Sequence, residues 1–294
     1  MSELPPTESR DPATAHIDRL DDVALARTLI AGQRAAVDAA LLAVDAVAAV
    51  IALVARALEH GGRVVLIGAG TSGRLGVLDA AELPPTFGLD PALVEGRIAG
   101  GDAALRAAVE GAEDDRDAGA RVVADLRPGD VAIGLSASGT APYVLAALRA
   151  ARDREARTVA IVNVPNSELE RAAEFAIVLE TGAEPIAGST RMRAGTAQKI
   201  VLNAISTGAM IRLGKTYGNR MVDVRATNAK LRARSERLVR ELAPEAGEPA
   251  ALLAAAGGSV KLAVVMARRG VARAEAEQLL LAARGRLGEI IDAD

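Results

Sequence analysis

The chain has 294 residues, of which 25% are charged, and its formal net charge is −3. This length fits one large domain, or one domain with a small appendage, and it allows a substantial core. The near balance of charge excludes a strongly basic nucleic-acid-binding surface, and the absence of cysteine excludes disulfides and a cysteine nucleophile. With two histidines and 1% aromatic residues, we expect neither a metal site nor a base-stacking surface.

The N-terminal part has no pattern typical of an export signal. Residues 1–21 are polar and predict an extended arm, which is either disordered or wraps a partner subunit. Residues 22–60 are densely apolar with helical spacing, and the pattern ends at Gly61 and Gly62. The longest uncharged run, residues 131–148, contains glycine, serine and proline, which favours a strand, a loop and a helix over a membrane span. We therefore expect a soluble, cytoplasmic protein with no membrane or nucleic-acid partner.

Apolar strands and helices alternate from residue 63 onward. The predicted strands are residues 63–68, 93–98, 130–135, 157–162 and 175–179, and the helices predicted between them are 74–81, 102–126 and 143–155. Strands that are apolar throughout and separated by helices indicate a parallel sheet that is covered on both faces. We predict an α/β fold with a doubly wound, parallel, five-stranded sheet flanked by helices.

The C-terminal part is helical. Residues 228–242 predict a charged, Arg-rich helix, residues 243–248 a linker, and residues 249–294 about three short helices. We therefore divide the chain into an arm with helices (1–60), a main domain (61–241) and a small helical domain (242–294).

Three turns rich in glycine and hydroxyl groups stand where an α/β sheet binds its ligands. They are residues 68–74 and 136–140, which follow predicted strands, and 188–191, which precede a helical segment. Backbone N–H groups at a helix N-terminus, together with small hydroxyls, form an anion site. Helix capping alone would also explain the Ser and Thr residues of any one turn. Two such turns on successive strands favour phosphate binding.

The first turn also matches the weak G-x-G-x-x-G pattern of dinucleotide-binding proteins. Its inserted Thr and Ser favour a single phosphate, and it lacks the G-K-[ST] of a P-loop.

Two acids follow these turns. Glu82 precedes Leu83-Pro84-Pro85, which predicts the end of a helix, so we expect Glu82 near the start of a loop. Glu113 lies in an acidic stretch, residues 110–115, which on its own is typical of a solvated helix face. Their spacing in the sequence does not by itself bring them together.

The chain resembles the N-acetylmuramic acid 6-phosphate etherase family of the sugar isomerase (SIS) superfamily. The resemblance is carried, in chain order, by TESRDPATAHID (7–18), LIGAGTSGRLGVLDAAELPPTFG (66–88), IAGGDAALRAAVEGAEDD (98–115), GSTRMRAGTAQKIVLNAISTGAMIRLGKTYGNRMVDV (188–224) and ATNAKL (226–231).

The resemblance implies a reaction and a set of site residues. The family cleaves the D-lactyl ether at C3 of its substrate without a metal or cofactor, which gives N-acetylglucosamine 6-phosphate and D-lactate in cell-wall sugar recycling. Glu82 and Glu113 fall on its two catalytic glutamates. Its substrate- and phosphate-binding turns correspond to Thr71, Ser72, Gly73, Ser138, Gly139, Thr140, Ser189 and Thr190. Ala141 departs from the family, which usually has Thr there.

The resemblance also implies a homodimer, with the arm and residues 22–60 as contacts, and a small C-terminal helical domain of the ubiquitin-associated-like kind. Two other functions stay open on the same fold. One is a non-catalytic sugar-phosphate sensor similar to the glucokinase regulatory protein, and the other is an aldose–ketose isomerase. Release of lactate distinguishes the etherase from both.

Overall fold

The computed structural model describes residues 4–224 and 229–293 of the chain. The predicted helix start at Asn228 lies outside these residues. The chain divides into two compact units, one formed by Met1–Ala81 with Ala92–Ser206 and the other by Glu82–Pro91 with Thr207–Asp294. Helices α4 (Gly70–Phe87) and α9 (Arg193–Arg212) each begin in the first unit and end in the second.

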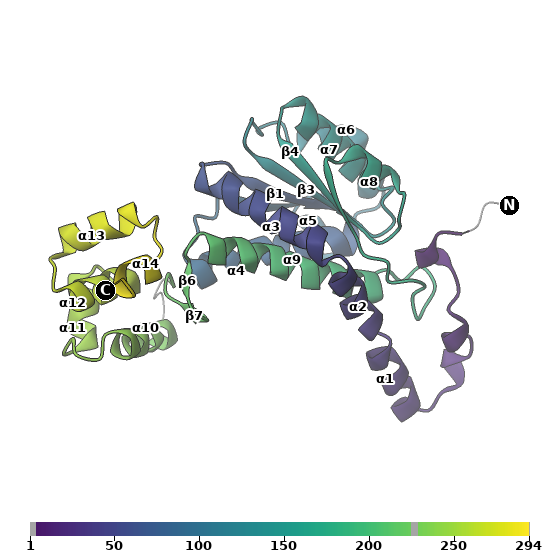
Figure 1. Cartoon of the computed structure of the whole chain (residues 1–294). Helices are drawn as coiled ribbons and strands as arrows, with labels where there is room; N and C mark the ends of the chain where they lie inside the picture. Colours follow the sequence, from purple (N-terminus) through teal and green to yellow (C-terminus); the bar gives the residue numbers. More distant parts are fainter. Residues whose placement is uncertain (1–3, 225–228, 294) are drawn as a thin grey trace. The chain divides into compact units, whose positions relative to one another are not determined.

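The first unit is built on a five-stranded sheet (Figure 1). Its strands are β1 (Val64–Gly68), β2 (Val94–Ile98), β3 (Val131–Ser136), β4 (Arg157–Val162) and β5 (Phe175–Val178). They pair in the order β2-β1-β3-β4-β5, and every pairing is parallel. The predicted parallel five-stranded sheet is confirmed. Because β2 and β3 lie on opposite sides of β1, the winding direction reverses between β1 and β3, where open α/β sheets bind ligands.

Helices cover both faces of this sheet. In Figure 1, α6 (Arg116–Arg121), α7 (Pro142–Asp153) and α8 (Glu168–Ala172) lie on one face, and α3 (Val44–Glu59) lies on the other. The central strands are buried on both faces, which explains their continuous apolar sequences. The side chains of Ile67, Ile133, Leu145, Leu148 and Ile161 are fully buried there.

The predicted helix over residues 102–126 is wrong. The structure has α5 (Ala103–Arg106), a 3-10 turn (Ala112–Asp114) and α6 instead. Gly111, with φ +72°, stands between α5 and the turn, and a left-handed residue does not continue an α-helix. The segment therefore places Glu113 on a short turn rather than on a long helix face.

The predicted helix end before Pro84 is also wrong. Helix α4 continues through Pro84 and Pro85 to Phe87, so Glu82 lies within the helix. The carbonyl of Pro84 accepts a hydrogen bond from the Gly88 N–H at 3.0 Å, which completes the last turn. Burial of the Leu83 and Phe87 side chains stabilises this turn. It compensates for the backbone hydrogen bonds that Pro84 and Pro85 cannot donate.

Helices α6 and α7 pack closely through a glycine. A Cβ atom at Gly119 would lie 2.1 Å from the carbonyl oxygen of Tyr143, so no larger residue fits while the helices keep this separation. The Tyr143 ring is buried beside this contact, and its burial raises the pKa of the phenol. The contact fixes α6, which directly follows the turn that carries Glu113.

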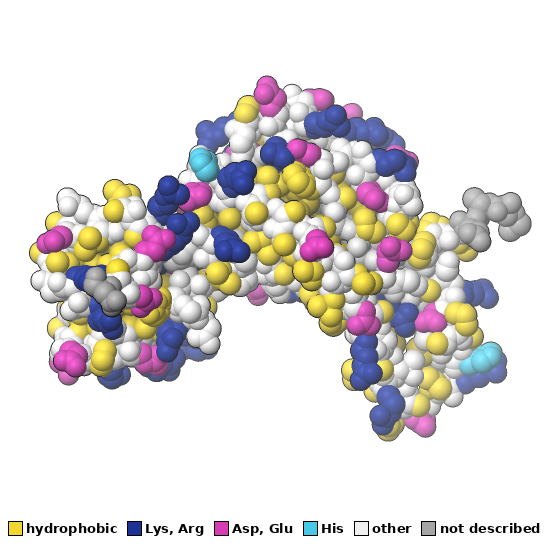
Figure 2. Space-filling view, in the orientation of Figure 1, with side chains coloured by type: hydrophobic (Ala, Val, Ile, Leu, Met, Phe, Trp, Pro, Cys, Tyr) yellow, Lys and Arg dark blue, Asp and Glu magenta, His cyan; other side chains and the backbone are white. Residues whose placement is uncertain are grey.

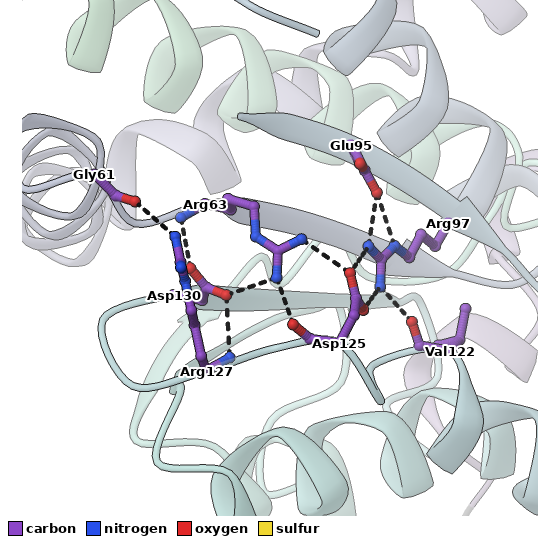
Figure 3. A network of polar contacts seen from close by, with 8 residues as sticks. All are labelled: Gly61, Arg63, Glu95, Arg97, Val122, Asp125, Arg127 and Asp130. Carbon is purple, nitrogen blue, oxygen red and sulfur yellow. Dashed lines mark hydrogen bonds and ion pairs between the residues drawn. The ribbon is translucent and has the colours of Figure 1, made fainter. Parts of the chain in front are cut away.

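A polar network joins β1 and β2 to the segment that precedes β3 (Figure 3). The Asp125 carboxylate accepts hydrogen bonds from the guanidinium groups of Arg97, at 2.6 and 2.9 Å, and of Arg63, at 2.9 Å. Arg97 also pairs with Glu95 at 2.7 Å, and Arg63 with the buried Asp130 at 3.0 Å. The hydrogen bonds from Arg97 are the main cause that holds the pKa of Asp125 well below its usual value.

The second unit contains a short hairpin, β6 (Thr216–Tyr217) with β7 (Arg220–Met221), and a helical part. Its helices are α10 (Ala229–Leu242), α11 (Pro249–Ala255), α12 (Val260–Arg269), α13 (Arg273–Ala282) and α14 (Gly288–Ile291). They share one core, to which Leu238, Val239, Val264 and Leu287 contribute. After residue 248 there is one more described helix than the three expected.

Over the part of the chain that is described, no individual helix has the length and apolar character needed to cross a membrane. Two sharply bent helix pairs, residues 22–42 with 44–59 and residues 249–255 with 260–269, meet that criterion only when each pair is taken together.

Candidate functional site

A cavity of about 250 Å³ lies at the carboxyl ends of β1 and β3 in the first unit. It is therefore at the position where the winding of the sheet reverses. Its wall is formed by Glu8, Ala69, Gly70, Thr71, Ser72, Glu113, Leu135, Ser136, Ala137, Ser138, Ala141 and Thr190. Four chain segments that are far apart in the sequence, together with the N-terminal arm, thus surround this cavity.

The predicted site residues divide into three groups. Five of them line the cavity: Thr71, Ser72, Glu113, Ser138 and Thr190. Gly73, Gly139, Thr140 and Ser189 belong to the same turns but are not part of its wall. Glu82 is an exposed residue of α4, belongs to the second unit and is not part of the cavity wall.

The first turn is the beginning of α4, and glycines allow it to lie against the end of β1. A Cβ atom at Gly73 would stand 2.6 Å from the carbonyl oxygen of Gly68, and one at Gly68 would stand 2.6 Å from the Gly73 nitrogen. Residues 70–72 therefore form the first helical turn directly above the strand end. The N–H groups of a first turn have no partner within the helix, so they provide an anion-binding site that faces this cavity.

The turn after β3 holds its hydroxyl groups by internal hydrogen bonds. Ser138 Oγ accepts hydrogen bonds from the Thr140 hydroxyl at 2.9 Å and from the Thr140 N–H at 3.3 Å. Ser136 Oγ accepts one from the Gly139 N–H at 3.0 Å. Ser138 Oγ also lies 3.4 Å from Ser136 Oγ, so its own hydrogen can point either to that hydroxyl or to an acceptor in the cavity such as a phosphate oxygen.

Behind the cavity, three buried side chains form a hydrogen-bonded chain. Ser72 Oγ donates to Gln198 Oε1 at 2.8 Å, and Gln198 Nε2 donates to Asn163 Oδ1 at 3.0 Å. Asn163 Nδ2 donates to the carbonyl oxygen of Leu179 at 3.0 Å. Gln198 and Asn163 are at most 1% exposed, so water does not compete for these bonds.

The direction of this chain is set by its last member. The Leu179 carbonyl can only accept, so Asn163 must donate to it and must accept from Gln198. Gln198 in turn must accept from Ser72. The hydroxyl of Ser72 is therefore committed as a donor to the protein, and toward the cavity it offers lone pairs. Ser138 can therefore donate a hydrogen bond toward the cavity, whereas Ser72 cannot.

The N-terminal arm is attached to the first unit, which the sequence left undecided. Its residues form three short 3-10 turns (Pro6–Glu8, Pro12–Thr14 and Ile17–Arg19). The carbonyl of Thr7 accepts from the Gly188 N–H at 3.0 Å, and the Thr14 hydroxyl donates to the Pro185 carbonyl at 2.9 Å. Asp11 pairs with Arg193 at 3.0 Å. These contacts bring Glu8 to the wall of the cavity.

Glu8 is a site residue that the sequence analysis missed. It lies within the motif TESRDPATAHID that carried part of the family resemblance, and that motif was the one signal available for it. Within residues 4–224 and 229–293, no three His, Cys, Asp or Glu side chains are grouped so that they could hold a metal ion.

Two domain families match the chain. The glucokinase regulatory protein N-terminal SIS domain matches residues 46–152, and the SIS domain matches residues 106–207. Among solved structures, the phosphoheptose isomerase of Neisseria gonorrhoeae is 18% identical with a TM-score of 0.48, covering 64% of this chain and 97% of that one.

Curated relatives match over nearly the whole chain. The N-acetylmuramic acid 6-phosphate etherase of Deinococcus radiodurans is 49% identical over 288 residues, which cover 97% of this chain and 94% of the relative. The protein of the same name from Gloeobacter violaceus is 50% identical over 263 residues, which cover 88% of this chain and 86% of the relative.

Proposed function

Because the chain belongs to the N-acetylmuramic acid 6-phosphate etherase family, we propose that it cleaves the D-lactyl ether at C3 of N-acetylmuramic acid 6-phosphate. The products are N-acetylglucosamine 6-phosphate and D-lactate, and the role is the recycling of cell-wall sugars. The same proposal makes the protein a carbon–oxygen lyase acting on a sugar phosphate.

One observation carries the proposal furthest. Glu113 lines the same cavity as Thr71, Ser72, Ser138 and Thr190, although the acidic stretch around it is typical of a solvated surface. A carboxylate beside an anion-binding helix N-terminus is the arrangement that proton abstraction from a sugar phosphate requires.

The chemistry needs one base and one acid. In the open-chain sugar, the C2 proton is acidified by the C1 aldehyde, and the lactyl oxygen is attached to C3. Glu113 takes the C2 proton, the C3–O bond breaks, and Glu82 gives a proton to the departing lactate oxygen. Water then adds to C3 of the unsaturated aldehyde while a proton returns to C2. No redox change occurs, so these steps need no oxidant or reductant.

The phosphate group has its own contacts in this proposal. The first turn of α4 offers the N–H groups of Thr71 and Ser72, and Ser138 contributes its hydroxyl group. Thr190, Ser189 and the other residues of the three turns support these groups. Binding at C6 holds a part of the substrate that does not react and orients C2 and C3.

The test is a lactate assay on the purified full chain with N-acetylmuramic acid 6-phosphate. We expect lactate release from the unchanged protein, a loss of about 10²- to 10⁴-fold in kcat for Glu82→Gln and for Glu113→Gln, and retained binding of N-acetylglucosamine 6-phosphate. Glu110→Gln is the matched control, since Glu110 is a neighbouring exposed acid outside the cavity wall. Full activity of both active-site variants, or a ketose product without lactate, contradicts the proposal.

We also propose that the protein is a homodimer. Exposed apolar side chains lie on α1 (Asp22–Ala31) and α2 (Arg34–Leu42), and Val23, Ile30 and Val37 are spaced seven residues apart. Figure 2 shows hydrophobic side chains among charged ones on the surface of the first unit. An apolar face of this kind suits a second copy of the chain. The mass in solution, measured by light scattering, tests this.

Three further sequence-based expectations remain proposals. The main domain spans residues 61–241, residues 242–294 form a ubiquitin-associated-like helical domain, and the protein is cytoplasmic. The helices after residue 248 share a core that supports the second of these, although α10 contributes Leu238 and Val239 to the same core.

A further inference from the structure

The Glu8 carboxylate lies at the cavity wall. The described residues provide neither a hydrogen bond nor an ion pair to it. Its Oε2 atom lies 3.0 Å from the position that a Cβ atom at Gly188 would take, so it occupies space that a glycine backbone leaves open. An acid that is brought to a cavity and lacks an internal partner is available to a ligand.

The position of Glu8 does not depend on its own side chain. The arm is attached through the Thr7 carbonyl, the Thr14 hydroxyl and the Asp11 carboxylate, and Thr7 is buried. A change at Glu8 therefore leaves the attachment of the arm in place. This allows the ligand contact to be tested apart from the folding of the arm.

The carboxylate of Glu8 determines which chemical groups of a ligand it can bind. An ionised carboxylate accepts hydrogen bonds and repels a phosphate group. Ser72 Oγ, elsewhere on the wall, also offers only lone pairs, because its hydrogen is donated to Gln198. The N–H groups of the first turn of α4 are donors at the same wall, so a phosphate fits there, and the acceptors Glu8 and Ser72 are left for neutral groups.

We propose that Glu8 binds the neutral part of the sugar by accepting a hydrogen bond from a sugar hydroxyl or from the acetamido N–H. This inference rests on the proposed function and adds to it a residue of the N-terminal arm that contacts substrate. Glu8 thereby helps to distinguish an amino-sugar phosphate from other small phosphates.

The experiment measures binding by isothermal titration calorimetry on the full chain. The ligands are N-acetylglucosamine 6-phosphate, which carries the sugar but has no ether to cleave, and inorganic phosphate. A charge-assisted hydrogen bond corresponds to roughly 10- to 100-fold in affinity. We expect Glu8→Ala to weaken sugar-phosphate binding by about this factor and to leave phosphate binding unchanged. Glu8→Gln keeps one acceptor oxygen and should be intermediate.

Asp18→Ala is the matched control, because Asp18 is an exposed acid on the same arm and is not part of the cavity wall. It should change neither affinity. Unchanged sugar-phosphate binding by Glu8→Ala overturns the inference, and so does an equal loss for both ligands, which would indicate a purely structural arm. The lactate assay on the unchanged protein is read separately, so the proposed function can stand while this inference fails. Failure of the unchanged protein to bind either ligand would overturn the inference as well.

Discussion

The hydrogen-bonded chain behind the cavity makes a sharp prediction for Asn163→Asp. The substitution preserves shape, so it creates neither a void nor a clash. It replaces the Nδ2 donor by an oxygen that faces the Leu179 carbonyl, which today accepts from Asn163 at 3.0 Å. The new carboxyl group restores that hydrogen bond only when it carries a proton. The difference in stability between the variant and the unchanged chain should therefore depend on pH.

The magnitude follows from burial. Asn163 is 1% exposed, and full burial raises a carboxyl pKa by about 3–5 units. Each unit corresponds to about 1.36 kcal/mol. For a rise of about three units above an ordinary value of about 3.9, the deficit relative to the unchanged chain is about 4 kcal/mol at pH 7 and about 1.5 kcal/mol at pH 5. The sign is fixed because the folded state then binds more protons than the unfolded state, so stability falls as pH rises between the two pKa values.

Urea unfolding at pH 7 and pH 5 measures this difference. Far-UV circular dichroism is the suitable probe because the chain has no tryptophan. Asn166→Asp is the control, since Asn166 is exposed and only three residues away, and its deficit should stay within about 0.5 kcal/mol at both pH values. If Asn163→Asp loses no stability at pH 7, or loses the same amount at both pH values, the direction of hydrogen bonding assigned to Gln198 and Ser72 is refuted.

Two other predictions concern the scaffold. Gly119→Ala must separate α6 from α7, because its Cβ would lie 2.1 Å from the Tyr143 carbonyl oxygen, and we expect a loss of about 3 kcal/mol in thermal unfolding. The exposed Ala120→Ser serves as its control, and equal melting temperatures for both would mean that the helices are not in close contact. Asp125→Asn removes a carboxylate whose pKa is held low mainly by Arg97, so its stabilising effect is present above about pH 4 and is lost as pH falls. Stability of this variant should decline less steeply than that of the unchanged chain on acidification, and parallel acid curves would count against the pairing.

The sheet could be predicted because its strands are apolar on both faces. Segments such as residues 64–68 and 131–136 are buried throughout, so no polar alternation confuses their pattern. The helices were harder to predict. Residues 102–126 have helical composition, yet Gly111 in a left-handed conformation interrupts them. Pro84 is a local stop signal that the burial of Leu83 and Phe87 overrides.

The cavity could be predicted only in part, because some of its residues are brought together by contacts between segments far apart in the sequence. Thr71, Ser72 and Ser138 follow strand ends, so the rule for ligand sites in α/β sheets indicates them. Glu8 reaches the cavity through contacts with residues near position 188, and no local pattern reveals such a pairing. The same holds for the pairing of Ser72 with Gln198, which are 126 residues apart.

The attachment of the arm has a consequence for biosynthesis. Thr14 leaves the ribosome early, but its acceptor, the carbonyl of Pro185, is 171 residues further along. At a translation rate of about 5–20 residues per second, the nascent arm waits roughly ten to thirty seconds for its docking surface. Glu8 therefore cannot take its place in the cavity wall until the chain has been made through Gly188, at almost the same time as the wall residue Thr190.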